Sequence, residues 1–230
     1  MEKFHEKRFP NETQHYRDAR NELLAAEIEL RKKTEEVAAL RRTLPYGGKV
    51  KEDYEFEEMD SGGNIRSTKL SGLFSDSKDT LIIYSFMYGP NDKKPCVYCN
   101  SIADGLSGMI FHTNDKINFV ISAKAPIEKM MEWANGRGWG NLRILSSGKN
   151  TYNTDYFAEN DKGSQLPMLN VFQRTADGIY HFYGSELLYV KFDDGMDARH
   201  VDSIWPVWNI LDFTPDGRGP KWNPKHSYKK

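Results

Sequence analysis

The middle of this 230-residue chain alternates apolar, strand-like runs with helix-like segments, and this alternation restricts the possible folds most strongly. Leu81–Met87 and Ile117–Ser122 are apolar runs typical of strands buried on both faces of a parallel sheet, and a third run covers Leu142–Leu145. Between them, Cys96 to about Phe111 and Pro126 to about Asn135 have helical character. The order β-α-β-α-β predicts parallel strands joined by right-handed crossovers.

Further strands are expected on either side of this core. Met168–Arg174 and Ile179–Gly184 flank Ala176-Asp177-Gly178, a hairpin signal that adds an antiparallel edge and makes the sheet mixed. Earlier in the chain, Tyr54 and Phe56 alternate with polar residues, which indicates a short edge strand or hairpin before Ser61-Gly62-Gly63-Asn64. Trp205–Phe213 forms a last aromatic-rich element, whose tryptophans we expect in the core.

A long helix is predicted from about Gln14 to Leu44, because the segment is rich in Ala, Glu, Leu, Arg and Lys and contains neither Gly nor Pro. Apolar residues recur in it every seven positions, at Leu23, Leu30, Val37 and Leu44, although Lys33 interrupts the second seam position. This narrow stripe fits packing on the chain's own globular body and packing on a second copy equally well. A homodimer through the helix is therefore one expectation.

The sequence divides at Pro45 and again near Pro215. We expect a helical arm over residues 1–45, one domain over residues 46–215, and a basic tail over residues 216–230 that is mobile from Lys221 on.

Charge and hydropathy exclude several classes of partner. With 32 Lys and Arg against 33 Asp and Glu, the formal charge of −1 provides no field that would recruit nucleic acid or an anionic membrane. The first ten residues are charged and lack the apolar stretch of a secretory signal, and no run of 18 apolar residues occurs. A cytoplasmic protein without nucleic-acid or membrane partners is expected.

Cys96 and Cys99 are the only cysteines, spaced as C-x-x-C at the predicted start of a helix. Residues i and i+3 share a helix face, so the two sulfurs can bond to each other. The helix N-terminus stabilises a thiolate on Cys96, and Lys93 and Lys94 are expected to add to that field. Cys96 is then the nucleophile, and Cys99 is the resolving thiol that attacks a mixed disulfide on Cys96.

A zinc site and a structural disulfide are the alternatives for this pair. Zinc usually requires four protein ligands, or three with an open position. The chain has no further cysteine, and His112, His181 and His200 lack the tight spacing of a metal site. A disulfide closing so small a loop would contribute only roughly 2 kcal/mol to stability. Redox use is therefore favoured over both, with no metal and no cofactor expected beyond an external reductant.

The order of elements around Cys96 and Cys99 resembles the thioredoxin superfamily. This resemblance implies an α/β three-layer sandwich with a central mixed sheet and the long N-terminal helix added, and the strand at Leu142–Leu145 resembles the extra strand of peroxiredoxin-like members. Leu166-Pro167 stands where the superfamily has a cis proline beside the active sulfurs, with the preceding backbone pairing with an extended peptide. Leu166 and Pro167 are then expected to bind substrate.

More closely, the chain resembles an uncharacterised bacterial branch of that superfamily, domain-of-unknown-function family eight-nine-nine, described as predicted dithiol-disulfide oxidoreductases. Segments that carry the likeness are residues 35–42, 44–56, 86–90, 103–105, 125–126, 138–139, 146–147 and 211–218.

The chain also departs from the best-known members of the superfamily. Its strand before the cysteines offers Ser85 where thioredoxin has a buried acid, and Val97-Tyr98 replaces Gly-Pro between the cysteines. Pro90 and Pro95 resemble the peroxiredoxin pattern, but its threonine is missing, so peroxidase activity is the weaker alternative.

The sequence thus predicts a thiol-disulfide oxidoreductase acting on a protein or small-molecule disulfide. A thiol peroxidase with Cys96 as peroxidatic cysteine, and a binding module without catalysis, are the alternatives. Lys93, Lys94, Pro95, Tyr98 and His181 are expected to support the site, although His181 also fits a hydrogen-bonded strand residue without a role in catalysis.

Overall fold

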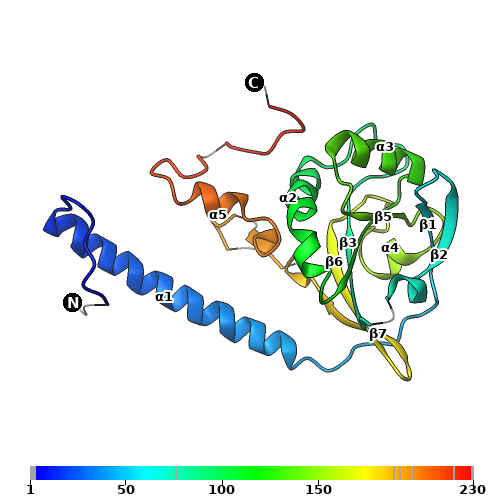
Figure 1. Ribbon diagram of the computed structural model, residues 1–230, viewed down its shortest axis with the longest axis horizontal. Helices are drawn as coiled ribbons and strands as arrows, with labels where there is room; N and C mark the ends of the chain where they lie inside the picture. The colour runs from blue at the N-terminus through cyan, green and yellow to red at the C-terminus, as the bar shows by residue number, and fades with distance from the viewer. Residues whose placement is uncertain are drawn as a thin grey trace. The chain divides into compact units, whose positions relative to one another are not determined.

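A computed structural model describes residues 4–75, 77–188, 190–191, 193–197, 199–219 and 221–228. The chain separates into two compact units, residues 1–45 and residues 46–230 (Figure 1). The first unit contains helix α1 (Gln14–Arg42), which begins where the Tyr16 N–H donates to the Thr13 side chain at 3.1 Å. The predicted long helix is thereby confirmed.

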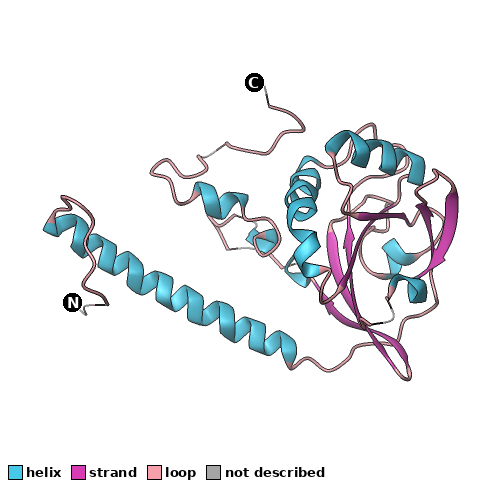
Figure 2. Ribbon diagram, in the orientation of Figure 1, coloured by secondary structure: helices cyan, strands magenta, loops and turns pink. Residues whose placement is uncertain are grey.

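The second unit is built on one seven-stranded mixed sheet in the order β2-β1-β5-β4-β3-β6-β7. Figure 2 shows the strands of this sheet in magenta. Strands β3, β4 and β5 are parallel, and the remaining neighbours pair antiparallel. The strands are β1 (Glu55–Met59), β2 (Ile65–Lys69), β3 (Thr80–Ser85), β4 (Asn118–Ala123), β5 (Arg143–Ser146), β6 (Met168–Thr175) and β7 (Gly178–Gly184).

Helices cover both faces of this sheet. One face is covered by three helices, α2 (Val97–Thr113), α3 (Ile127–Arg137) and α5 (Val207–Leu211). Their apolar residues form one cluster with the residues of β3 and β4 that point to this face. The opposite face packs against the 3-10 helix η1 (Leu70–Leu73) and the short helix α4 (Tyr152–Asp155). Two crossovers that step in the same direction along the sheet, β3-α2-β4 and β4-α3-β5, place their helices on one face because both are right-handed. The three-layer, thioredoxin-like α/β fold with its mixed sheet is confirmed.

Helix α4 is absent from the sequence prediction, which left this polar stretch without structure. It spans only four residues, so it carries no periodic pattern. Tyr152 holds it in place, since its fully buried ring lies 5.4 Å from the ring of Phe56 and 6.2 Å from that of Phe172. Tertiary packing, and not local propensity, fixes this helix.

The predicted hairpin after Tyr54 is confirmed as β1 and β2, with Asp60 organising the turn. Asp60 Oδ1 accepts hydrogen bonds from the Gly62 and Asn64 N–H groups at 2.8 and 2.9 Å. Strand β1 lies inside the sheet, next to β5, and β2 forms the edge. The buried Glu58 carboxylate connects β1 to β5 by accepting two bonds from Arg143, at 2.9 and 3.0 Å.

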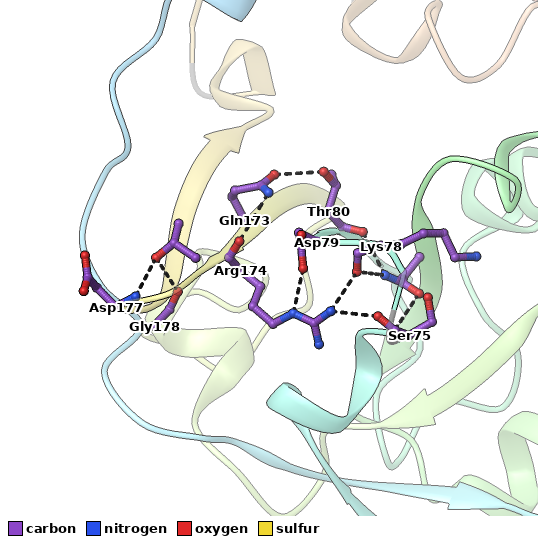
Figure 3. Close-up of polar contacts among 10 residues, drawn as sticks. Ser75, Lys78, Asp79, Thr80, Gln173, Arg174, Asp177 and Gly178 are labelled. Atoms are coloured by element: carbon purple, nitrogen blue, oxygen red, sulfur yellow. Dashed lines mark hydrogen bonds and ion pairs between the residues drawn. The ribbon is translucent and has the colours of Figure 1, made fainter.

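A polar cluster fastens β6 to the segment that leads into β3 (Figure 3). Arg174 donates to the Asp79 carboxylate and to the Ser75 carbonyl, both at 2.8 Å, and Thr80 donates to Gln173 at 2.8 Å. These contacts fix the register in which Thr80 opposes Gln173 and, at the other end of the pair, Ser85 opposes Met168. The start of β6 is thereby held at the end of β3 that leads to the cysteines.

The C-terminal segment packs against the domain, in contrast to the mobility expected from Lys221 on. Tyr98 donates a hydrogen bond to the Asn223 side chain. Arg137 donates to the His226 carbonyl at 2.7 Å, and the His226 ring lies 5.4 Å from that of Trp133. Aromatic and amide side chains, which a count of basic residues overlooks, hold this segment.

Across the described ranges, no helix combines the length and apolar character needed to cross a membrane.

Candidate functional site

The loop after β3 places the two cysteines at the first turn of α2. The Phe86 N–H donates to the Ser122 carbonyl at 2.8 Å, and the Cys96 N–H donates to the Met87 carbonyl at 2.9 Å. Cys96 is the N-cap residue of α2, and its carbonyl accepts from the Asn100 N–H at 2.9 Å. The motif therefore begins the helix directly, with its first sulfur over the free N–H groups of the first turn.

A hydrogen bond between Gly89 and Asp92 closes the turn in this loop. The Gly89 N–H donates to Asp92 Oδ2 at 2.7 Å, and a Cβ atom at position 89 would lie only 2.9 Å from the same oxygen. The loop is also bound to α3, because Lys129 Nζ donates to the Pro90 carbonyl at 3.2 Å. Cys96 thus follows a loop held from both sides.

The two thiols are unpaired and differ in exposure. Cys96 is half-buried, whereas Cys99 is 1% exposed. The side chain of Cys99, as hydrogen-bond donor, lowers the pKa of Cys96 to about 6 against the opposing effect of burial. The N–H groups of Cys99 and Tyr98 lower this pKa as well, although neither makes a capping hydrogen bond of ordinary geometry with the sulfur.

The same hydrogen bond acts on Cys99 in the opposite direction. Because Cys99 gives its proton to this contact and is buried beside the Cys96 charge, its pKa lies well above the ordinary value. The Tyr84 side chain and the Met87 N–H act the other way and favour the Cys99 thiolate. At neutral pH the pair therefore holds one thiolate, on Cys96, and one thiol, on Cys99.

Lys93 and Lys94 are exposed and are not among the groups that shift the pKa of Cys96. Lys94 lies beside Cys96 in a cleft, whereas Lys93 lines a separate hollow with Trp133 and His226. Pro95 is buried directly before Cys96. The expected contribution of the two lysines to thiolate stability is thus replaced by that of the partner thiol and the helix end.

Tyr98, between the cysteines, belongs to an aromatic cluster. Its ring lies 5.6 Å from the ring of Trp205 and 6.5 Å from that of Trp208, and its hydroxyl binds Asn223. The C-terminal segment therefore holds one of the two residues that separate the sulfurs.

Leu166 and Pro167 lie immediately before β6, whose first residue, Met168, pairs with Ser85 at the end of β3. The described residues contain no cis peptide bond, so the Leu166–Pro167 bond is trans, unlike that of the superfamily motif. The Leu166 N–H already donates to the Ala158 carbonyl at 2.8 Å. This donor is not available to an incoming peptide.

His181 lies away from the sulfurs, which corrects the expectation that it supports the site. Its Nε2 and Asn170 Oδ1 are 2.9 Å apart, and its ring contacts Tyr156 and Phe172 on the α4 side of the sheet. Burial lowers its pKa, which favours the neutral ring. The alternative of a hydrogen-bonded strand residue fits this placement, because alternate residues of β7 point to opposite faces.

A cleft of about 700 Å³ opens beside Cys96, bounded by residues 87–96 and 159–165. Lys124 and Glu159, both largely buried, line it and form an ion pair at 3.0 Å. Lys94, Lys162 and Asp92 also line it. The lining reaches Gln165 but does not include Leu166 or Pro167. The cleft is called the cysteine cleft below.

In the described part of the chain, no group of three or more His, Cys, Asp or Glu side chains is arranged to hold a metal ion.

Tyr84 is the site residue that the sequence prediction missed. It lies on β3, is 1% exposed, and faces Cys99 from the strand side. The prediction examined this strand only for a carboxylic acid. The alternation of side chains along a strand could have revealed Tyr84. Tyr84 and Phe86 share the face that carries α2, whereas Ser85 points to the other face.

A model of a protein family described as "Bacterial protein of unknown function (DUF899)" matches residues 6–230. A comparison with curated proteins gave no match. Similar solved structures include thioredoxin peroxidase I of Plasmodium yoelii, with 12% identity over 81% of this chain and 100% of that chain, at a TM-score of 0.46. The reduced 2-Cys peroxiredoxin of Plasmodium vivax shows 15% identity over 74% and 98%, and AhpC of Enterococcus faecalis 13% over 78% and 98%, each at 0.47.

Proposed function

This chain belongs to the DUF899 family of bacterial proteins, and we propose that it is a thiol-disulfide oxidoreductase in which Cys96 is the nucleophile and Cys99 the resolving thiol. The observation that carries the proposal is the asymmetry of the pair. Cys96 meets the cleft with a pKa of about 6, whereas Cys99 is buried with a raised pKa. A thiolate that is accessible from a cleft, next to a buried thiol, is the arrangement that exchange chemistry requires.

The reaction has two steps. The Cys96 thiolate attacks a substrate disulfide, forms a mixed disulfide and releases the first substrate sulfur as a thiolate. Cys99 then attacks the Cys96 sulfur, so that the Cys96–Cys99 disulfide forms and the second substrate sulfur leaves with the proton. The substrate is reduced, the pair is oxidised, and an external dithiol returns it to the starting state.

The cysteine cleft supports approach of the substrate from the side of Cys96. Its volume of about 700 Å³ lies within the range of small-ligand sites, and it is open along the loops at residues 87–96 and 159–165. A small disulfide fits this space, and a protein loop can also enter it. Both classes of disulfide remain in the proposal.

The pH dependence of alkylation tests the proposed nucleophile. Iodoacetamide reacts with the thiolate, so the rate should follow the thiolate fraction of Cys96. We expect the rate to rise with pH, to be half-maximal at about pH 6, and to level off above it. An unperturbed thiol would reach half-maximum at about pH 8.5.

Mass spectrometry of the alkylated peptides assigns the modified residue, since Cys96 should react in the folded protein and Cys99 only after unfolding. The catalytic test is turnover of a disulfide with excess dithiol. A half-maximum near that of a free thiol, together with no turnover, would leave the binding module as the better account. Consumption of the dithiol that depends on peroxide instead would support the thiol peroxidase.

We also propose that the arm over residues 1–45 mediates a homodimer through α1. Its heptad residues are exposed within the chain, Leu23 at 53% and Leu30 at 68%. A second copy of the same helix would cover such a stripe by packing side chains in the manner of a coiled coil. Burial of several leucines supplies the driving force for association.

Leu30→Lys should convert the dimer into a monomer, because a charge would enter the centre of the seam. Sedimentation equilibrium measures the mass directly. Glu35→Lys, on the opposite side of the same helix, is the matched control and should stay dimeric. A parent protein that sediments as a monomer at high concentration would contradict the dimer.

The proposed setting is the cytoplasm, where reducing partners can recycle the pair. The basic segment over residues 216–230 takes no part in the proposed reaction.

A further inference from the structure

Tyr84 packs in the same buried cluster as Cys99, the inner member of the cysteine pair. It is 1% exposed, and in the described part of the chain its hydroxyl has no hydrogen-bond partner of ordinary geometry. Burial raises the pKa of this hydroxyl, and both cysteines raise it further, Cys99 more strongly than Cys96. A buried hydroxyl without a partner destabilises the fold, and the neighbouring Cys99 distinguishes Tyr84 from the other buried hydroxyls of this kind, because its sulfur can become a charged acceptor.

The resting state explains why this acceptor is missing. The Cys99 thiol directs its proton to Cys96, so the Cys99 sulfur carries no charge that would attract a donor. When a substrate sulfur occupies Cys96, the Cys96 charge disappears, and Cys99 must lose its proton as it attacks. Cys99 then becomes a buried thiolate, and a charged acceptor draws a stronger hydrogen bond than a neutral one.

We propose that Tyr84 is a further catalytic residue, which donates a hydrogen bond to the Cys99 thiolate as it attacks the mixed disulfide. The proposal rests on the thiol-disulfide exchange proposed above. In this step the bond between Cys96 and the substrate sulfur breaks and the Cys96–Cys99 bond forms. The Cys99 proton passes to the departing substrate sulfur, or to water where that sulfur leaves as a stable thiolate, and Tyr84 keeps its own proton throughout.

Tyr84 keeps its proton because burial and the two neighbouring cysteines raise its pKa well above the ordinary value. It acts as a donor only. The strand before the cysteines lacks the buried acid that thioredoxin uses to accept a proton. A hydrogen bond from Tyr84 would lower the barrier in a different way, by stabilising the negative charge on Cys99.

Tyr84→Phe tests the proposal, because it removes the hydroxyl and leaves the ring in the core. The probe is dithiobis-nitrobenzoate, an aromatic disulfide that releases one coloured thiolate when Cys96 attacks and a second when Cys99 resolves. Stopped-flow absorbance separates the two releases. In the variant we expect the first release to stay within about twofold of the parent and the second to slow by about tenfold or more, the usual effect of losing a hydrogen bond to a charged group.

Tyr152→Phe is the matched control. Tyr152 is equally buried, and among the described residues its hydroxyl also has no hydrogen-bond partner of ordinary geometry, but it packs on the opposite face of the sheet. Both releases should keep their parental rates in this variant. A second release that is unchanged in Tyr84→Phe, or one slowed only as much as the first, would overturn the role of Tyr84.

The number of thiolates released by the unmodified protein tests the proposed function independently of the role of Tyr84. Two releases per chain support exchange chemistry, and Tyr84 is then judged by the variant. A reduced parent that releases no coloured thiolate, or one equivalent without a second, would overturn the proposed function and the role of Tyr84 with it.

Discussion

Cys96→Ser should abolish thiol-disulfide exchange, lowering the rate of disulfide reduction by about 1000-fold or more. A serine hydroxyl stays protonated at neutral pH, and the helix end and Cys99, which lower the pKa of Cys96, cannot make it a comparable nucleophile. The measurement is turnover of a disulfide with excess dithiol. Full activity of Cys96→Ser would show that Cys96 is not the nucleophile.

Cys99→Ser should keep the first step and lose the second. The introduced serine hydroxyl can still donate to Cys96, so a thiolate persists there, but no sulfur is present to resolve the mixed disulfide. The variant should therefore accumulate as a covalent adduct with its substrate, detected as a mass increase under non-reducing conditions and reversed by excess dithiol. Recovery of the variant free of adduct, with parental turnover, would contradict the role of Cys99.

Trp205→Ala should lower the free energy of unfolding by about 3–5 kcal/mol, as large-to-small substitutions of buried aromatic residues do. Trp205 is 1% exposed and contacts the rings of Tyr98, Trp208 and Trp222, at 5.6, 5.5 and 6.4 Å. Its indole N–H also donates to Ser101 Oγ at 2.9 Å, so the variant leaves that hydroxyl without its donor. The substitution leaves a cavity next to the helix that carries the cysteines.

Urea denaturation measures this loss, with the m-value showing whether the same surface unfolds. Phe213→Ala, a truncation in the same part of the chain at a residue that is 83% exposed, is the control and should change stability by less than about 0.5 kcal/mol. Equal, small losses in both variants would show that the aromatic cluster contributes little to stability.

The central fold was predictable because its signals are local. The apolar run at Leu81–Met87 and the Asp177-Gly178 turn each define an element within a few residues, and the order of strands and helices then leaves few topologies. The structure confirms β3, β4, β5 and the β6–β7 hairpin with boundaries shifted by one or two residues. Helix α4 escaped because only contacts between Tyr152 and distant aromatic rings specify it.

The candidate site was predictable in part. The spacing of Cys96 and Cys99 at a helix start reveals the pair, but the differences between the two thiols depend on burial and on their mutual hydrogen bond, which need three dimensions. The same holds for Lys94 and His181, because their spacing in the sequence does not show where their side chains lie relative to the two sulfurs. The contact of Asn223 with Tyr98 joins residues more than a hundred positions apart, and no local pattern signals it.

The burial of Cys99 behind Cys96 also offers a gauge of folding. A bulky thiol label, such as a maleimide on a polymer chain, reaches only the outer sulfur while the native packing is intact. Counting labels per chain then distinguishes intact from opened molecules in a mixture, because the inner sulfur gains its label only when the core comes apart.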